Sequence, residues 1–301
     1  MSKRHGKDKD VHESVSDEDD SDSDSSSGSS NESVGRSVSP QSKARLLAAR
    51  TILQYQPISS ILLAKDTLLL DFACGTGAFS QHLASRIDRI LGIDVDDRAI
   101  REFNTRARHQ GIDEIEMQAI QCDILSEESL PYGKPWFGKV DAVASALGFH
   151  HLADMASVTK TLVKRFLKVG GWIAVIDLMY DPDTSPIFEN AKQAKANHQD
   201  NCQHGHDDLH HYAQHVGGIK TDDIKHAFDS AGLDCVDVFE RVFDIAVMVP
   251  RRLIPEHCNS NEPGSSSDDQ TRSSAPDSSK VKVLLPFLLA VGRKGVFSVS
   301  D

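Results

Sequence analysis

An apolar run at residues 67–72 leads directly into a glycine turn. The run reads Thr-Leu-Leu-Leu-Asp-Phe, and residues 73–77 read Ala-Cys-Gly-Thr-Gly. A short, nearly continuous apolar run is typical of a strand covered on both faces, and glycines permit backbone conformations that other residues avoid. A helical pattern over residues 78–86 follows. The three pieces predict a strand, a tight turn and a helix, which is the repeating unit of parallel α/β sheets.

The alternation of strands and helices continues along the chain. Further strands are predicted at residues 89–94, 115–124, 139–146 and 172–178. Helices are predicted from Ser42 to Pro57, and at residues 97–108, 156–167 and 221–231. We expect Gly170 and Gly171 to stop the helix at 156–167, Thr221 to cap the last helix and Gly232 to follow its end. This spacing predicts a doubly wound, Rossmann-like α/β fold.

The C-terminal part does not follow this alternation of strands and helices. Residues 235–249 and 281–293 both read as strands, and no helical pattern lies between them. Consecutive strands without a crossover helix should pair antiparallel. The connection at 256–280 is rich in Ser, Asp, Asn and Pro, so we expect it to be disordered. Pro286 should lie at a strand start or a bulge, because it cannot donate to the ladder.

The first 41 residues differ in composition from the rest. They hold ten acidic residues, five basic residues and thirteen serines, with almost no large apolar side chains. Such a segment cannot bury enough apolar surface to offset the entropy lost on ordering. We therefore expect a disordered acidic tail at 1–41 and a single domain at 42–297. The acidic serine run at 14–33 suits an acidophilic kinase or a protein partner, and equally a merely solubilising tail.

Charge and cysteine content narrow the class of protein. A net charge of -12 argues against a general nucleic-acid binder, which normally carries a basic face. The five cysteines contain no C-x-x-C pair, which suggests free thiols in a reducing compartment. We see no secretory h-region and no uncharged apolar run near the roughly 20 residues of a membrane span. We expect a cytoplasmic protein, with the nucleus as the alternative, and no membrane partner.

Three acids lie at the ends of the first three predicted strands. Asp71 stands four residues before Gly75, and Asp94 and Asp123 end the next two strands. Ligands of doubly wound sheets bind at this carboxyl edge. A dinucleotide site would need a third glycine where Ser80 stands, so a dehydrogenase is the weaker reading. Asp71 suits a cationic amino group, Asp94 can accept hydrogen bonds from both ribose hydroxyls, and Asp123 suits an exocyclic amine such as the adenine N6.

In these residues the chain resembles the class I S-adenosylmethionine-dependent methyltransferase superfamily, and within it the small-molecule, type 11-like branch. Residues 71–77 look like the first motif, Asp94 like the ribose-binding acid and residues 122–124 like the adenine-binding step. Residues 141–152 end in Gly-Phe-His-His-Leu and resemble the fourth-strand motif of that branch. Residues 167–171, Leu-Lys-Val-Gly-Gly, resemble its L-K-P-G-G segment.

The resemblance covers roughly residues 45–295 and implies a seven-stranded, mostly parallel sheet with an antiparallel last strand. Residues 286–294 look like the closing strand of a group of small fungal methyltransferases. The implied cofactor is S-adenosyl-L-methionine. The residues expected to contact it are Asp71, Ala73, Cys74, Gly75, Thr76, Gly77, Asp94, Val95, Asp123, Ile124 and Ser145.

Histidines supply the remaining chemical candidates. His150 and His151 follow the fourth strand, where an acceptor should meet the methyl group. Either one could be a general base, or the pair could only shape the pocket, because methyl transfer can rest on proximity and orientation alone. Six histidines lie at 198–215. The resemblance makes the segment 180–220 a substrate lid. A metal site is the weaker reading, because the stretch lacks established metal-binding spacing.

These observations predict methyl transfer to a small-molecule acceptor whose identity the sequence does not reveal. Residues 145–148 read Ser-Ala-Leu-Gly, where an Asn/Asp-Pro-Pro-Tyr/Phe motif would mark methylation of a base or a glutamine. A protein or RNA methyltransferase is therefore the enzymatic alternative. The non-enzymatic alternative is a cofactor-binding scaffold whose tails recruit partners.

Overall fold

The computed structural model describes residues 39–130, 135–196, 214–254 and 280–296. The predicted acidic tail, except for its last three residues, and the predicted disordered segment at 256–280, except for Lys280, lie outside these ranges. So do five of the six histidines at 198–215. Within the described ranges, no helix combines the length and the apolar character that crossing a membrane requires.

Seven strands form one sheet in the order β3-β2-β1-β4-β5-β7-β6. The strands are β1 (Leu68–Phe72), β2 (Arg89–Asp94), β3 (Met117–Gln121), β4 (Val140–Ala146), β5 (Leu167–Leu178), β6 (Leu233–Pro250) and β7 (Lys280–Lys294). The first five strands pair in parallel, and β7 pairs antiparallel with both β5 and β6. The predicted doubly wound sheet with an antiparallel last strand is confirmed.

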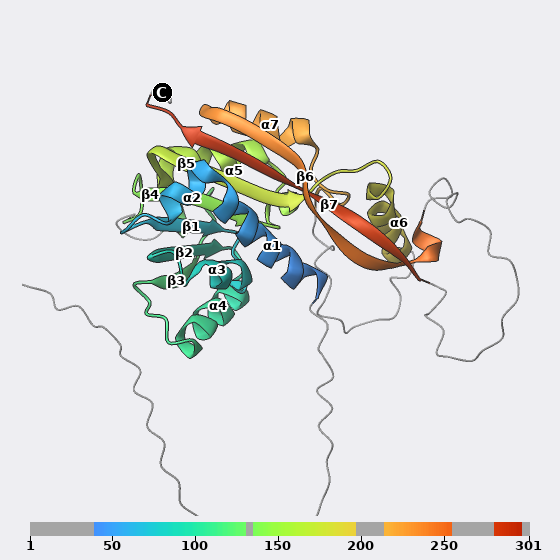
Figure 1. Cartoon of the computed structure of the whole chain (residues 1–301), viewed down its shortest axis with the longest axis horizontal. Coiled ribbons are helices and arrows are strands. Elements are labelled where there is room, and N and C mark those ends of the chain that lie inside the picture. The colour runs from blue at the N-terminus through green and yellow to red at the C-terminus, as the bar shows by residue number, and fades with distance from the viewer. Residues whose placement is uncertain (1–38, 131–134, 197–213, 255–279, 297–301) are drawn as a thin grey trace, which may run out of the picture. The chain divides into compact units, whose positions relative to one another are not determined.

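Helices cover both faces of this sheet (Figure 1). One face packs against α1 (Pro40–Gln54), α2 (Gln56–Leu62), α3 (Ala78–Leu83) and α4 (Asp97–His109). The other packs against α5 (Met155–Thr161), its π-helical continuation η3 (Leu162–Phe166) and α7 (Thr221–Ser230). Short 3-10 turns are η1 (Glu127–Ser129), η2 (Phe149–His151) and η4 (Arg251–Leu253). Two apolar cores result, one on each side of the sheet.

The order of the strands reverses at β1, which lies between β2 and β4. Every residue of β1 is buried, as its apolar run predicts. Asp71 pairs in register with Gly92 of β2 and with Ala144 of β4. The crossovers leave β1 in opposite directions, so a crevice opens at the carboxyl ends of β1 and β4, and this is the position at which doubly wound sheets bind ligands.

The hairpin of β6 and β7 extends beyond the sheet (Figure 1). The pairing of β5 with β7 ends at Leu178 and Phe287, but β6 and β7 stay paired as far as Pro250 and Lys280. Helix α6 (Ser185–Ala196) lies beside the far end of this two-stranded ribbon, where Asn190 Nδ2 donates to the Leu253 carbonyl at 3.1 Å. The ribbon and α6 thus frame the space beyond the carboxyl end of β5.

Proline and glycine account for most differences from the sequence-based prediction. Pro57 does not end the first helix, which stops at Gln54; it lies in the first turn of α2, where a missing N–H is harmless. Gly170 and Gly171 do not stop a helix either. They lie inside β5 where its register against β4 shifts, and a Cβ on Gly171 would lie 2.8 Å from the Asp141 carbonyl oxygen.

One further prediction needs correction. Lys220, not Thr221, occupies the N-cap of α7, and Thr221 Oγ1 instead donates to Glu240 at 2.8 Å. Pro286 lies within β7, next to a register shift on β6, at the point where β7 leaves β5. Gly232 does follow the end of α7, with a φ of 71°.

Candidate active site

The turn after β1 is held in a conformation that few sequences adopt. Ala73, Gly75 and Gly77 have φ values of 56°, 52° and 82°, all in the left-handed region. For Ala73 this conformation costs about 1–2 kcal/mol. Two backbone bonds stabilise the turn, from Cys74 N–H to the Ile93 carbonyl at 3.1 Å and from Gly77 N–H to the Cys74 carbonyl at 3.0 Å. Such strained backbone is often found at ligand sites.

The two glycines of the turn have different surroundings. A Cβ on Gly75 would meet nothing within 4 Å. A Cβ on Gly77 would lie 2.5 Å from the ring of Phe103, which is fully buried on α4. Gly77 therefore lets the turn pack against the core, whereas Gly75 leaves the other side of the turn open for a ligand.

Asp94 ties the end of β2 to this turn. Its Oδ2 accepts from the Gly75 N–H at 2.7 Å, and its Oδ1 accepts from the Asp96 N–H at 3.0 Å. Each carboxylate oxygen can accept a second hydrogen bond. Asp94 is half-buried, so it can still accept from ligand hydroxyls while it fixes the open face of the turn.

Asp71 is a buried acid directly before the turn, with an exposed fraction of 1%. Ser80 Oγ donates to its Oδ2 at 2.6 Å, and no residue in the described ranges donates to its Oδ1. Burial raises the pKa of Asp71 to about 7; the Asp94 charge also raises it, while the Ser80 hydrogen bond and the Arg45 charge lower it. A cation close to this carboxyl group would favour its ionised form.

The turn after β4 connects the glycine turn to a second site. A Cβ on Gly148 would lie 2.6 Å from Ala73 Cβ and 2.8 Å from Ser145 Oγ, so the two turns are in close contact. Ser145 Oγ is buried and has no hydrogen-bond partner among the described residues. Leu147 is also left-handed, with a φ of 65°, which directs it away from this contact and toward an apolar pocket.

That apolar pocket has a volume of about 260 Å³. It is lined by residues of α1, the turn after β4, the end of β5, α6 and the β6–β7 ribbon: Pro40, Gln41, Ala44, Arg45, Leu147, His150, His151, Leu178, Phe188, Ile245, Val247, Val249, Leu285 and Phe287. Ile245, Val247 and Val249 alternate along β6, so they point to one face of the ribbon. The ribbon therefore forms an apolar wall opposite α1.

His150 is the buried titratable group of this pocket. Its Nδ1 lies 2.7 Å from Oδ1 of Asp177, which is completely buried near the end of β5. Burial lowers the pKa of His150, but the charge and hydrogen bond of Asp177 outweigh it, and the net direction is upward. The ring of His151 lies against that of His150, with centroids 4.0 Å apart.

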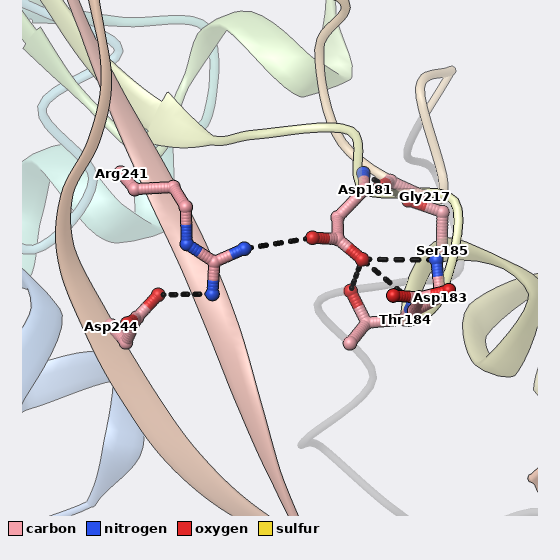
Figure 2. A network of polar contacts seen from close by, with 7 residues as sticks. All are labelled: Asp181, Asp183, Thr184, Ser185, Gly217, Arg241 and Asp244. Carbon is pink, nitrogen blue, oxygen red and sulfur yellow. Dashed lines mark hydrogen bonds and ion pairs between the residues drawn. The ribbon is translucent and has the colours of Figure 1, made fainter. Parts of the chain in front are cut away.

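A polar network holds the segment between β5 and α6 in place (Figure 2). Arg241 donates to Asp181 at 2.9 Å and to Asp244 at 3.2 Å. Asp181 accepts from the backbone N–H groups of Asp183 and Thr184, directly before α6, and Ser185 Oγ donates to the Gly217 carbonyl at 2.5 Å. The left-handed φ of Arg241, 49°, lies where the β6 register shifts and directs its side chain to Asp181. The network thus fixes α6 relative to the apolar wall.

The structure brings some of the predicted site residues together and leaves others apart. Asp71, Ala73, Gly75, Gly77, Asp94 and Ser145 gather around the two touching turns, and His150 and His151 line the adjoining pocket. Asp123 and Val95 are exposed at strand ends farther along the edge, and the side chain of Ile124 is buried in the core with that of Cys122. Thr76 is half-buried. Cofactor contact stays a prediction for all of them.

Asp177 and Arg45 were not among the site residues predicted from the sequence. Arg45 lines the apolar pocket from α1, and its positive charge acts on both Asp71 and His150. Burial lowers the pKa of Arg45, and the guanidinium forms no ion pair or hydrogen bond with any described residue. An acid inside the apolar strand end Val-Ile-Asp-Leu is the signal that would have identified Asp177. The described residues contain no cluster of three metal-ligating side chains.

A doubly wound sheet with an antiparallel closing strand and an acid-flanked glycine turn at its switch point defines the class I S-adenosylmethionine-dependent methyltransferases. A family model described as a methyltransferase domain matches residues 63–232, more than half of the chain, and the chain belongs to that family. S-adenosylmethionine is accordingly its cofactor. The open side of Gly75, the free oxygen of Asp71 and the unpartnered Ser145 hydroxyl fit such a group.

Similar proteins agree on the class. An uncharacterized methyltransferase of Schizosaccharomyces pombe is 36% identical over 118 residues, which is 38% of this chain and 40% of that protein. A protein named ubiquinone biosynthesis O-methyltransferase, from Leptothrix cholodnii, is 27% identical over 144 residues, 48% of this chain and 58% of that protein. The chain thus spans about half the length of these relatives. The crystal structure of the YcgJ protein from Bacillus subtilis shares the fold, with a TM-score of 0.52 and 14% identity over 82% of this chain and 99% of that one.

Proposed function

We propose that this protein transfers the methyl group of S-adenosylmethionine to a small-molecule acceptor in the apolar pocket. The observation that carries the proposal is the contact between the two turns. Gly148 lies against Ala73 of the glycine turn, while its neighbours Leu147 and His150 line the pocket. A cofactor held on the open side of Gly75 and an acceptor in the pocket would therefore share one wall.

The proposed roles of the chain follow from position and charge. Asp71 binds the amino group of the methionine part, Asp94 the ribose hydroxyls and Asp123 the adenine. When bound, the cofactor supplies an electrophilic methyl group on a sulfonium. The apolar lining excludes water from the acceptor and holds it in place, so that proximity and orientation reduce the barrier.

The pocket favours a small acceptor over a macromolecule. Its volume of about 260 Å³ lies just below the roughly 300–1,000 Å³ of typical small-molecule sites. Residues of α1, α6 and the β6–β7 ribbon surround it. A protein or nucleic-acid acceptor would need an open groove instead.

Calorimetry followed by a transfer assay tests the proposal. We expect S-adenosylmethionine to bind the purified protein and isotope-labelled methyl to appear in one or a few products of a small-molecule cell extract. Binding without any transfer would favour the cofactor-binding scaffold. Binding of NAD in place of S-adenosylmethionine would favour a dehydrogenase. Label on protein or RNA alone would contradict the small-molecule acceptor.

The raised pKa of Asp71 predicts a pH-dependent affinity for the cofactor. Below pH 7 the carboxyl group becomes neutral and loses its attraction for the amino group, because its pKa lies at about 7. We expect the Kd for S-adenosylmethionine to rise by up to about tenfold per pH unit below that value, and to level off above it. Calorimetry between pH 5.5 and 8.5 measures this Kd for the unmodified protein and for an Asp71→Asn variant.

The variant serves as the control for this pH dependence. Asp71→Asn should bind more weakly at pH 8 and show a nearly flat profile, and an unchanged slope would mean that another group is responsible. The folding stability of the cofactor-free protein should depend on pH in the opposite direction. Because the folded pKa lies above the unfolded one, the contribution of Asp71 to stability is present at acid pH and is lost as the pH rises through about 7.

A further inference from the structure

The carboxylate of Asp177 contacts both the main chain and the ring of His150. Asp177 Oδ2 accepts from the His150 backbone N–H at 3.1 Å, and Oδ1 lies 2.7 Å from the ring Nδ1. Oδ1 also accepts from the Leu178 N–H at 2.7 Å. On the other side, the His150 carbonyl accepts from the backbone N–H groups of Gln214 and His215, at 3.1 and 2.9 Å. The main chain of His150 is therefore fixed from two sides, and Asp177 fixes its imidazole through Nδ1.

The Asp177 contact also fixes the tautomer of His150. A carboxylate accepts only, so a neutral imidazole must carry its proton on Nδ1 and leave a lone pair on Nε2. No residue in the described ranges hydrogen-bonds to Nε2. His150 lines the apolar pocket, so a molecule bound there can supply the hydrogen bond that Nε2 lacks.

We propose that His150, positioned by Asp177, is the general base for a phenolic hydroxyl acceptor bound in the apolar pocket. This inference rests on the proposed function. His150 is the group that touches the acceptor, and Asp177 acts through it as a positioning residue.

The chemistry of the acceptor follows from the presence of a fixed base. A carboxylic acid is already ionised at neutral pH and needs no base, and a neutral amine attacks with its own lone pair. An aliphatic alcohol is too weak an acid for an imidazole to assist effectively. A phenol, with a pKa near 10 like that of tyrosine, lies in the range where an imidazole base is useful.

The remaining lining agrees with a phenol. The pocket walls are aliphatic and aromatic, with Phe188 and Phe287 among them, which suits a ring. Arg45 lies on the wall formed by α1, and its charge acts on His150. A guanidinium there disfavours an ammonium acceptor and stabilises negative charge that develops on a phenolic oxygen.

The step balances without any further reactant. The acceptor O–H bond breaks and its proton passes to Nε2 of His150. The oxygen electron pair forms the new O–C bond while the methyl–sulfur bond breaks and leaves its pair on sulfur. Asp177 accepts the hydrogen bond from Nδ1–H, and this contact stabilises the imidazolium. The groups that surround the imidazole charge are Asp177 from β5, His151 from the same turn and Arg45 from α1.

Nitrogen-15 NMR of the histidine rings tests the tautomer and the free nitrogen without turnover. We expect His150 to carry its proton on Nδ1, and 4-propylphenol to shift the Nε2 signal while propylbenzene does not. In Asp177→Asn we expect the pKa of His150 to fall, because the burial that lowers it is no longer opposed. An Nε2–H tautomer in the free protein, or no response to the phenol, would overturn the proposal.

Turnover tests the acceptor class and the base separately. The labelled product of the cell extract should be an aryl methyl ether. His150→Gln should reduce kcat on it by about 100-fold with little effect on S-adenosylmethionine binding, and the matched change at the exposed His226 on α7 should leave kcat unchanged. In Asp177→Asn the acid limb of the rate profile should move to lower pH.

The outcomes distinguish this inference from the proposed function. A labelled N-methyl, S-methyl or ester product, or unchanged turnover in His150→Gln, would overturn the phenol and base assignment and leave the methyltransferase proposal standing. If no extract component accepts the label, the proposed function itself fails. His150→Gln keeps Asp177 and the apolar walls. It therefore still tests the proposal if Asp177→Asn does not fold.

Discussion

Gly75→Arg is expected to raise the Kd for S-adenosylmethionine by roughly 100-fold or more, equivalent to about 2.7 kcal/mol, while the protein stays folded. A side chain at Gly75 would meet nothing within 4 Å, so it fits sterically, but it occupies the open side of the turn. Its positive charge would also oppose the sulfonium. The left-handed φ of 52° adds about 1–2 kcal/mol of strain, which a domain of ordinary stability survives.

Gly111→Arg provides the matched control for this prediction. Gly111 has a φ of 72° and equally open surroundings, but it lies after α4, on the way to the amino end of β3. The two variants share the added charge, the added bulk and the backbone strain. Calorimetry should show normal affinity for Gly111→Arg. Equal affinity in both variants would show that the turn is not the cofactor site.

Gly77→Ala is expected to lower the free energy of unfolding by about 3 kcal/mol. The new Cβ would lie 2.5 Å from the ring of Phe103, which is fully buried and cannot move aside without opening the core. Strain from the left-handed φ of 82° adds to this overpacking. Urea denaturation followed by circular dichroism gives the measurement.

Gly232→Ala separates the cost of overpacking against Phe103 from the cost of backbone strain. Its φ is 71°, but its Cβ would meet nothing within 4 Å, so only the backbone strain applies. We expect a loss of about 1 kcal/mol for this variant. If both variants lost the same stability, the contact between Gly77 and Phe103 would not matter, and the packing of the turn onto α4 would be misdescribed.

Local patterns were sufficient for the parallel part of the fold. The predicted bounds of β2, residues 89–94, match the structure, and β1 and β4 differ from prediction by one residue each. In each case a glycine or a charged residue follows the short apolar run within three residues. Pairing of β6 with β7 followed from the missing crossover helix.

The elements that were predicted wrongly or not at all share a physical cause. Each is fixed by a contact with a residue that lies far away in the sequence. Gly170 and Gly171 look like a helix stop, but the pairing of Leu167 with Val140 draws them into β5. Helix α6 was not predicted, because its position depends on the network between Asp181 and Arg241, which are 60 residues apart.

The same division applies to the site. The glycine turn and Asp94 could be identified because they occupy one short stretch around a strand–turn–helix junction. Asp177 could not be paired with His150 in advance, since 27 residues separate them and no periodic pattern relates them. The apolar pocket could not be predicted from the sequence either, because its lining residues come from six separate parts of the chain.

A crystal structure of the protein with S-adenosylhomocysteine is the most direct test of the central claim that the two touching turns form a shared cofactor and acceptor site. We predict that the ribose hydroxyls contact the carboxylate of Asp94, that the amino group lies near Oδ1 of Asp71 and that the sulfur is directed toward the apolar pocket. A nucleoside bound elsewhere, or a sulfur directed away from His150, would contradict this claim.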